Sequence, residues 1–315
     1  MDGGVMDTAL SVNPTNRSLI NTDAETKALI FDIKRDCSED GPGIRTTVFF
    51  KGCPLSCVWC QNPEGIDRQP GIYYRADLCH PELCGLCPAD CLYMTHSELE
   101  MFHGLQSDRI AKCPSKALEH VGYWISLDEL LYRVLIDKPF FQSSGGGVTV
   151  SGGEATLQPL FLEKFLQRLK KEQVSTALET CGFFNYQTFK KRILPWLDCI
   201  YFDLKLIDEA AHRQFTGQSN KPVLKNLVRL LNEAQIPVNV RIPLIPGITA
   251  TQKNLSEIAG FLKKQGIKTV YLMPYNPLWV EKSEKLGLTP KYDHRQFMSD
   301  EQLAACVAEI SQKQL

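Results

Sequence analysis

The sequence predicts an α/β protein built around a parallel β-sheet. Segments typical of strands and of helices alternate from residue 126 onward, as in repeated strand–helix units. Polar residues follow one expected strand after another, which is typical of a functional site at the carboxyl ends of parallel strands. The pattern fits a complete or incomplete barrel, and an open doubly wound sheet is the alternative.

Two strands are expected before these units. Residues 28–33 and 45–51 are rich in apolar and β-branched side chains. Between them, residues 40–43 (Asp-Gly-Pro-Gly) predict a tight loop. Residues 53–117 show little apolar periodicity, so we expect a bound metal to shape this stretch.

The later elements are predicted from short apolar runs and from apolar helical faces. Ser126 is expected to cap the first helix, because Glu129 follows at capping-box spacing. Pro159 is expected to open the next helix. The other expected helices are 223–234, 255–265 and 300–312. The expected strands are 148–150, 175–180, 200–204, 237–243 and 268–273.

Charge and hydropathy exclude several classes of protein. The chain has 315 residues with 35 Lys plus Arg and 36 Asp plus Glu, which gives a formal net charge of -1. Such a chain lacks the excess of basic residues by which many proteins bind nucleic acids. No apolar run approaches the roughly 18 residues of a membrane span. We therefore expect neither a nucleic acid nor a membrane as partner.

The N-terminus and the cysteines predict a cytoplasmic protein with metal chemistry. Residues 1–26 lack the basic start and apolar middle of a signal peptide, so we interpret them as a flexible leader. Twelve cysteines are many for such a chain. Most of them lie between residues 53 and 113. Without an export signal, this clustering favours metal binding or catalysis over disulfides.

Polar residues stand at the expected ends of five successive strands. They are Ser151-Gly152-Gly153-Glu154, Glu179-Thr180-Cys181-Gly182, Asp203 with Lys205, Arg241, and Tyr275-Asn276. Asp203 and Lys205 are two residues apart, so they point to one face of the strand. Loops are polar in any protein, which is the alternative explanation. The whole series nevertheless predicts a site for a small charged ligand.

Cys53, Cys57 and Cys60 place three thiols on one short loop. A structural zinc site takes four ligands, and a four-iron, four-sulfur (4Fe-4S) cluster also usually takes four cysteines. Three thiols leave one metal with an open position, which is typical of a catalytic site. A plain zinc site with a fourth ligand from elsewhere in the chain is the alternative.

This cysteine motif resembles the cluster motif of radical S-adenosylmethionine (SAM) enzymes. More narrowly, residues 40–47 and 51–64 resemble the glycyl-radical enzyme activating proteins, the family of pyruvate formate-lyase activating enzyme. Three later motifs fit the same family, at residues 148–154, 201–205 and 246–249. The resemblance therefore runs from about residue 29 to the C-terminus.

The resemblance implies a partial parallel (β/α)6-type barrel, the radical SAM core, and a role for each matching residue. The catalytic 4Fe-4S cluster would be held by Cys53, Cys57 and Cys60, and SAM would chelate its fourth iron. The amino group of SAM would be received by Gly152, Gly153 and Glu154. The adenine would lie near Trp59 and Gln61.

Further residues match positions around the carboxylate and ribose of SAM. These residues are Thr180, Asp203, Lys205 and Arg241. A cation is expected beside a carboxylate in a site poor in water. Asn276 stands where some relatives have His, and Glu179 where they often have Asp. We interpret Cys181, next to Thr180, as a packing residue.

The implied reaction forms a glycyl radical on a partner protein. An electron, from flavodoxin or ferredoxin as reductant, cleaves SAM to a 5′-deoxyadenosyl radical, which takes a Cα hydrogen from a glycine of a glycyl-radical enzyme. The loop at residues 40–45 is expected near the incoming peptide, or else is a tight turn without a binding role. A radical SAM enzyme acting on a small molecule and an iron–sulfur electron-transfer module are the alternative functions.

A second group of cysteines resembles part of a bacterial ferredoxin. Five cysteines cannot supply two four-thiolate clusters, so we predict one auxiliary 4Fe-4S cluster. Its expected ligands are Cys79, Cys84, Cys87 and Cys113. Cys113 is preferred because a proline follows it, as the motif requires. A set ending in Cys91 is one alternative, and an insert with zinc or without metal is another.

These assignments divide the chain into three parts. Residues 1–26 form the leader. Residues 27–65 and 122–315 form the radical SAM core. Residues 66–121 form a ferredoxin-like cysteine-rich insert between the two halves of the core.

Overall fold

The computed structural model describes residues 27–79, 110 and 113–312. The expected leader therefore lies outside the described residues. Among the described helices, none is both long enough and apolar enough to span a bilayer.

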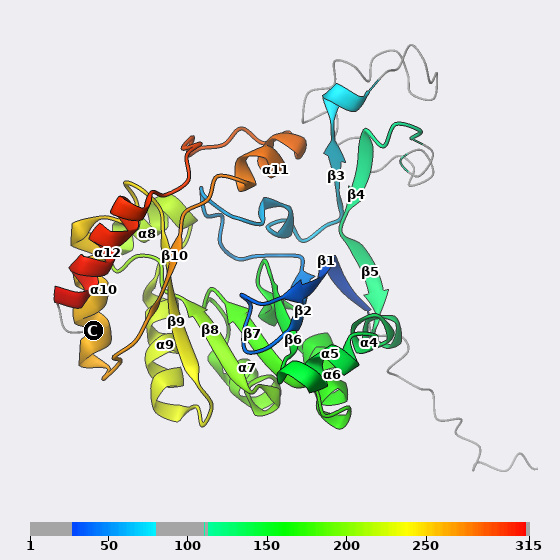
Figure 1. Cartoon of the computed structure of the whole chain (residues 1–315), viewed down its shortest axis with the longest axis horizontal. Coiled ribbons are helices and arrows are strands. Elements are labelled where there is room, and N and C mark those ends of the chain that lie inside the picture. Colours follow the sequence, from blue (N-terminus) through cyan, green and yellow to red (C-terminus); the bar gives the residue numbers. More distant parts are fainter. Residues whose placement is uncertain (1–26, 80–109, 111–112, 313–315) are drawn as a thin grey trace, which may run out of the picture.

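A single large sheet carries the fold. It has eight strands in the order β10-β9-β8-β7-β6-β2-β1-β5 (Figure 1). Their bounds are β1 Lys27–Cys37, β2 Arg45–Phe50, β5 Tyr123–Ser126, β6 Gly147–Gly152, β7 Ser175–Thr180, β8 Cys199–Asp203, β9 Val238–Leu244 and β10 Tyr271–Pro274. Strand β2 and strands β6 to β10 run parallel to one another. Strands β10 and β5 are the two ends of the strand order, so the described sheet is not closed, as in an incomplete barrel. The parallel strands with helices outside them confirm the predicted α/β class.

The sheet differs from the prediction at both edges. The expected strand over residues 28–33 is longer, and it pairs antiparallel with β2 on one side and with β5 on the other. Strand β5 was not predicted. At the opposite edge, β10 begins at Tyr271 and not at residue 268, because its pairing with β9 starts only at Tyr271 and Arg241.

Helices pack outside the sheet and at its ends (Figure 1). They are α4 Leu127–Leu135, α5 Lys138–Ser144, α6 Pro159–Lys171, α7 Tyr186–Arg192, α8 Glu209–Thr216, α9 Lys221–Glu233, α10 Gln252–Lys264, α11 Trp279–Lys285 and α12 Asp300–Gln312. The predicted start of α4 is confirmed, because the Ser126 hydroxyl accepts a hydrogen bond from the Glu129 backbone N–H. The predicted start of α6 is also confirmed, since Pro159 is its first residue. Short 3₁₀ turns follow several strands and loops: η1 Pro63–Gly65, η2 Ala76–Leu78, η4 Ala155–Leu157 and η5 Leu194–Trp196.

The core lies between the sheet and these helices. Val148, Val150 and Leu178 of the central strands are fully buried, and so are Phe165 and Leu166 of α6. Burying each such side chain contributes about 1.5–3 kcal/mol. The core therefore gives the strand ends a rigid base.

A two-stranded sheet stands at the base of the predicted insert. Strand β3, Gly71–Tyr74, pairs antiparallel with β4, Leu118–Val121. Figure 1 shows this pair projecting from the large sheet beside β1 and β5. The chain thus leaves the large sheet and returns to it through neighbouring strands.

Candidate functional site

A cavity of about 320 Å3 lies at the carboxyl ends of the parallel strands. Its size falls in the range of small-molecule and cofactor sites. The residues predicted to bind the catalytic cluster and SAM all line it except Glu154 and Asn276. Asp40, Glu179 and Cys181 line it as well. Ser151, at a predicted strand end, lines it too, whereas the sequence reasoning gave no site role to Phe49, Leu55, Asn62, Pro243 and Met273.

The cysteine loop is tied by its backbone to the end of α8. Ser56 N donates to Thr216 O at 2.8 Å, and Val58 N donates to Phe215 O at 3.0 Å. The loop closes on itself where Cys60 N donates to the carbonyl of Cys57 at 3.1 Å. These bonds hold the three thiols, which are half-buried, on one wall of the cavity.

The thiols are suited to binding metal after losing their protons. Burial raises the pKa of Cys57 to about 12 and also raises the pKa of Cys60. Cys53 differs, because a hydrogen bond with Cys181 lowers its pKa. The described residues contain no group of three or more His, Cys, Asp or Glu placed to hold a single ion. Because Cys57 and Cys60 are protonated when unbound, metal binding at this loop would release their protons.

The glycine pair after β6 packs directly against this loop. A Cβ on Gly153 would lie 2.4 Å from the carbonyl oxygens of both Gly52 and Gly65. The Gly153 N–H donates to Phe50 O at 2.8 Å, and the Glu154 N–H donates to Gly52 O at 2.8 Å. Only a residue without a side chain permits this approach, which brings the Gly-Gly-Glu backbone beside the cysteine loop.

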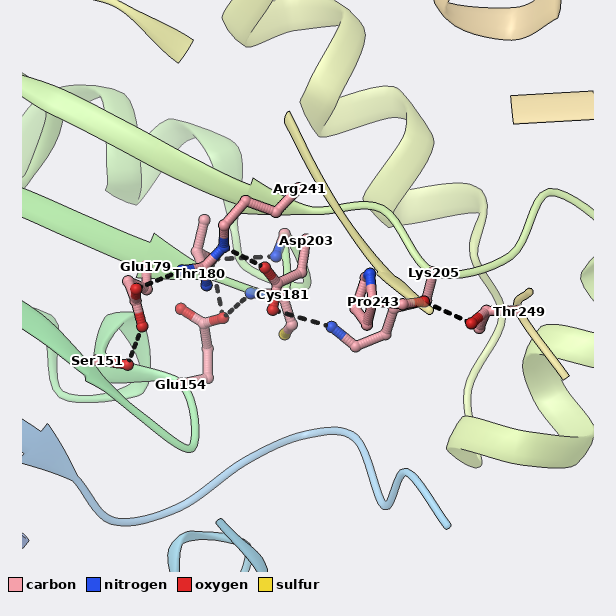
Figure 2. A network of polar contacts seen from close by, with 11 residues as sticks. Ser151, Glu154, Glu179, Thr180, Cys181, Asp203, Lys205, Arg241, Pro243 and Thr249 are labelled. Carbon is pink, nitrogen blue, oxygen red and sulfur yellow. Dashed lines mark hydrogen bonds and ion pairs between the residues drawn. The ribbon is translucent and has the colours of Figure 1, made fainter. Parts of the chain in front are cut away.

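Glu154 lies behind the cavity wall. Its side chain is buried, and Oε1 accepts from the Thr156 hydroxyl at 2.7 Å. Oε2 accepts from the Thr180 hydroxyl and from the Cys181 N–H, each at 2.8 Å (Figure 2). The carboxylate thus ties the end of β6 to the end of β7. Cys181 is buried, as the packing interpretation predicts, but it also lines the cavity.

Charged residues from three adjacent strands and the residues that follow them form a network at the cavity (Figure 2). Arg241 Nε donates to Asp203 Oδ1 at 2.9 Å, and its Nη1 donates to Glu179. The Ser151 hydroxyl donates to the other oxygen of Glu179 at 2.6 Å. Lys205 Nζ donates to Asp203 Oδ2 at 3.3 Å. The network therefore has two cations and two carboxylates.

Burial and pairing oppose each other in this network. Burial disfavours the ionised form of Asp203, yet Arg241 and Lys205 hold its pKa below the usual value. Burial outweighs Arg241 at Glu179 and raises the pKa of that carboxyl. For Lys205, Asp203 and the thiols of Cys57 and Cys181 more than offset burial, so its pKa is raised. Lys205 is therefore a firmly charged cation close to the cysteine loop.

Two of the residues predicted to bind SAM, Asn276 and Trp59, have little or no side-chain surface in the cavity. Asn276 uses its side-chain oxygen to accept from the Leu278 N–H at 3.3 Å, and its backbone carbonyl accepts from Gln61 Nε2 at 3.1 Å. Its side chain does not line the cavity. Trp59 lines the cavity but is almost fully buried, because it packs in an apolar cluster with Tyr275 and Trp279.

The predicted auxiliary ligands are only partly within the described residues. Cys79 and Cys113 are free and half-buried. Cys113 lines a second cavity together with Glu64 and Tyr73, beside the base of the insert. Cys84, Cys87 and the alternative ligand Cys91 lie outside the described residues.

Comparisons with known proteins identify the family of the chain. The sequence profile of the Radical SAM superfamily matches residues 47–259. The choline trimethylamine-lyase activating enzyme of Oleidesulfovibrio alaskensis is 37% identical over 302 residues, which cover 90% of this chain and 96% of that protein. The pyruvate formate-lyase 2-activating enzyme of Escherichia coli is 37% identical over 275 residues, which cover 86% of this chain and 85% of that protein.

A solved structure shows the same fold. The crystal structure of a radical SAM methyltransferase from Sphaerobacter thermophilus matches with a TM-score of 0.52 and 14% identity, over 90% of this chain and 74% of that one. At 14% identity this structure is evidence for the fold alone. The family is shown by the relatives with 37% sequence identity. The chain therefore belongs to the Radical SAM superfamily and, within it, to the activating enzymes of glycyl-radical enzymes.

Proposed function

We propose that this chain installs a glycyl radical on a partner enzyme, with SAM bound in the cavity at the strand ends. The observation that carries the proposal is the meeting of three thiols, the Gly-Gly-Glu backbone and the charged network around one cavity. Membership of the family implies a 4Fe-4S cluster and SAM. It disfavours the electron-transfer module as an alternative, since such a module has no use for SAM.

Cys53, Cys57 and Cys60 are the proposed ligands of the catalytic cluster. When bound, the cluster supplies the electron that breaks the sulfonium C–S bond of SAM and leaves a 5′-deoxyadenosyl radical. The protein contributes no general base to this step. Its residues orient SAM and keep water away from the reacting carbon.

The amino-acid end of SAM is proposed to lie between the glycine pair and Lys205. The backbone carbonyls of Gly152 and Gly153 suit an amine donor. Among the described residues, Asp203 takes one of the three N–H donors of Lys205, which leaves donors for a ligand carboxylate. Arg241 adds a second positive charge next to the same site.

The remaining predicted residues have supporting roles in this proposal. Glu154 and Thr180 hold the strand ends in place through their mutual hydrogen bond. Trp59 and Gln61 border the space proposed for the adenine. Asn276 acts through its backbone, which accepts a hydrogen bond from Gln61.

The substrate is proposed to be a backbone glycine on a glycyl-radical enzyme. Glycine suits hydrogen abstraction because its radical is delocalised by the flanking amides and no side chain is in the way. The loop at residues 40–45 is proposed to contact the incoming peptide, and this is supported by Asp40, which lines the cavity. The names of the relatives refer to different activated enzymes. The partner is therefore proposed by its class, as a glycyl-radical enzyme.

The insert is proposed to form a separate part at residues 66–121, between core segments 27–65 and 122–315. One auxiliary 4Fe-4S cluster on Cys79, Cys84, Cys87 and Cys113 is proposed for it. Flavodoxin or ferredoxin is the proposed electron donor, and the cytoplasm is the proposed compartment.

Anaerobic reconstitution with iron and sulfide tests these assignments. Wild type and a Cys57→Ser variant are compared by iron content and by reductive SAM cleavage. About eight irons and 5′-deoxyadenosine from wild type alone are expected. About four irons with intact cleavage would contradict the auxiliary cluster and leave the core. A fully loaded wild type that does not cleave SAM would contradict the proposed function.

A further inference from the structure

The segment that follows Cys60 is held by a lysine from far along the chain. Lys282, on α11, donates from Nζ to Gln61 O at 3.1 Å, to Asn62 Oδ1 at 3.3 Å and to Glu64 Oε1 at 2.7 Å. An ammonium group has three N–H donors. These contacts therefore use all of them on one short segment.

The segment belongs to the cavity wall. Gln61 and Asn62 both line the cavity. Asn62 stands at the N-cap position of η1, where an Asn side chain usually accepts from a backbone N–H. Here the side chain makes no such cap, and it accepts from Lys282 instead. The Asn62 side chain thus links the start of η1 to α11.

The same helix also contacts the residue before Cys60. Trp279 and Val280 of α11 pack with Trp59 in one apolar cluster. Cys60 is therefore flanked on both sides by groups that α11 holds. On the opposite side, Lys51 Nζ donates to Glu64 O at 2.6 Å, so the loop exit lies between β2 and α11.

Glu64 joins Lys282 to the exit of the cysteine loop through a buried carboxylate. Its side chain is only 7% exposed, and Oε1 pairs with Lys282. Within the described part of the chain, Oε2 is buried without a hydrogen-bond partner. Tyr73 also interacts with this carboxylate, and burial together with Glu64 raises the pKa of Tyr73. Lys282 supplies the only cation that an ion pair gives Glu64 in the described part of the chain.

We propose that Lys282 is a positioning residue for the cluster and SAM site. It holds the exit of the cysteine loop so that Cys60, Gln61 and Asn62 keep their orientation around the cavity. This inference rests on the proposed assignment of Cys60 as a cluster ligand. Some residues do not bind the metal but hold its ligands in place. Replacing such a residue commonly lowers metal affinity or activity by about 10- to 100-fold.

The test compares Lys282→Met with Lys285→Met on the same helix. Lys285 is a matched control because it pairs with the exposed Glu281 at 2.6 Å and does not touch the loop. Both full-length variants are reconstituted anaerobically, and the readouts are iron content, the Kd for SAM and the EPR spectrum of the reduced cluster with and without SAM. Lys282→Met is expected to raise the Kd about tenfold and to weaken the SAM-induced spectral change. Lys285→Met is expected to stay within about twofold of wild type.

Two further variants separate positioning from folding. Lys282→Arg keeps the charge and several donors, so it is expected to recover part of the SAM affinity. The double variant Lys282→Met/Glu64→Gln removes the unpaired buried charge and is expected to melt near wild type while its SAM affinity stays low. Wild-type SAM binding by Lys282→Met, or by the double variant, would overturn the inference. A wild type that binds no SAM would contradict the proposed function instead.

Discussion

Arg241 donates from Nε to Asp203 Oδ1 across 2.9 Å, and the two residues are also paired in register on adjacent parallel strands. The same guanidinium contacts Glu179 on the next strand but one. Its charge is therefore shared by two half-buried carboxylates. Arg241 therefore contributes both to the stability of the strand ends and to the charge of the cavity.

Replacing Arg241 with Met is expected to destabilise the protein strongly. The change leaves Glu179 without its cation and Asp203 with Lys205 alone; breaking a fully buried pair costs about 3–5 kcal/mol, so this half-buried pair is expected to cost about 2–3 kcal/mol. Urea denaturation at neutral pH measures the loss. Arg295→Met is the control, because Arg295 pairs with Glu284 on the exposed surface, where an ion pair contributes about 1 kcal/mol or less. Equal losses in the two variants would contradict the importance of the half-buried pair.

Replacing Lys205 with Met is expected to affect SAM more than folding. Asp203 keeps Arg241 as its partner, so no carboxylate of the network is left without a cation. A hydrogen bond to a charged group contributes about 1.5–3 kcal/mol, which corresponds to a rise in the SAM Kd of about 10- to 100-fold. Titration of the reconstituted enzyme with SAM measures it. Lys190→Met, which removes an exposed pair with Glu233, should leave the Kd unchanged. Unchanged SAM affinity in Lys205→Met would exclude a carboxylate contact at this residue.

The sequence predicted the cavity well because it is built from local motifs on parallel strands. The carboxyl ends of such strands meet at one edge of the sheet, so the order of the strands alone groups Gly152, Thr180, Asp203 and Arg241. The helix at residues 300–312 was predicted to the residue, since its apolar face and first turn are local features.

The features that the sequence did not predict depend on contacts between residues far apart in the chain. Strand β5 has four residues and leaves Trp124 more than half exposed, so its sequence lacks an alternating pattern. The contact of Lys282 with Gln61 joins residues 221 positions apart. The role of Glu154 behind the wall depends on how closely β6 and β7 approach. None of these relationships has a local signal in the sequence.

Replacing Gly153 with Ala is expected to displace the cysteine loop. The new Cβ would lie 2.4 Å from two backbone oxygens, which cannot move away as a flexible side chain can. Such overpacking costs about 1–3 kcal/mol. Thermal unfolding and iron content after reconstitution measure both consequences.

Gly260→Ala provides the matched control for this change. Gly260 lies within α10, and a Cβ there would meet no atom within 4 Å. Because Ala is the better helix former, this variant should gain up to about 1 kcal/mol and bind iron normally. If Gly153→Ala also binds a full complement of iron at wild-type stability, the close approach is not required.

Acidification is expected to weaken the anchor of the cysteine loop through His212. This side chain is buried in α8, where its Nδ1 lies 2.7 Å from Gln218 O and 3.0 Å from the Thr216 hydroxyl. The carbonyl of Thr216 in turn accepts from Ser56 of the loop. Burial lowers the pKa of His212 from its ordinary value of 6.5. The neutral imidazole is therefore the form that fits the fold.

The folded protein is expected to lose stability as the pH falls, because the pKa of His212 is lower in the folded chain than in the unfolded chain. Above pH 6.5 both the folded and the unfolded chain hold His212 neutral, so its contribution to stability is fully present. Below that pH the unfolded chain takes up a proton first, and stability falls until the pH reaches the lower folded pKa. His212→Gln keeps a polar side chain without titrating, so it should flatten this part of the profile of unfolding free energy against pH. Denaturation series from about pH 8 to about pH 5, which bracket the ordinary pKa of histidine, compare the two proteins. An identical slope in both would show that other groups cause the acid sensitivity.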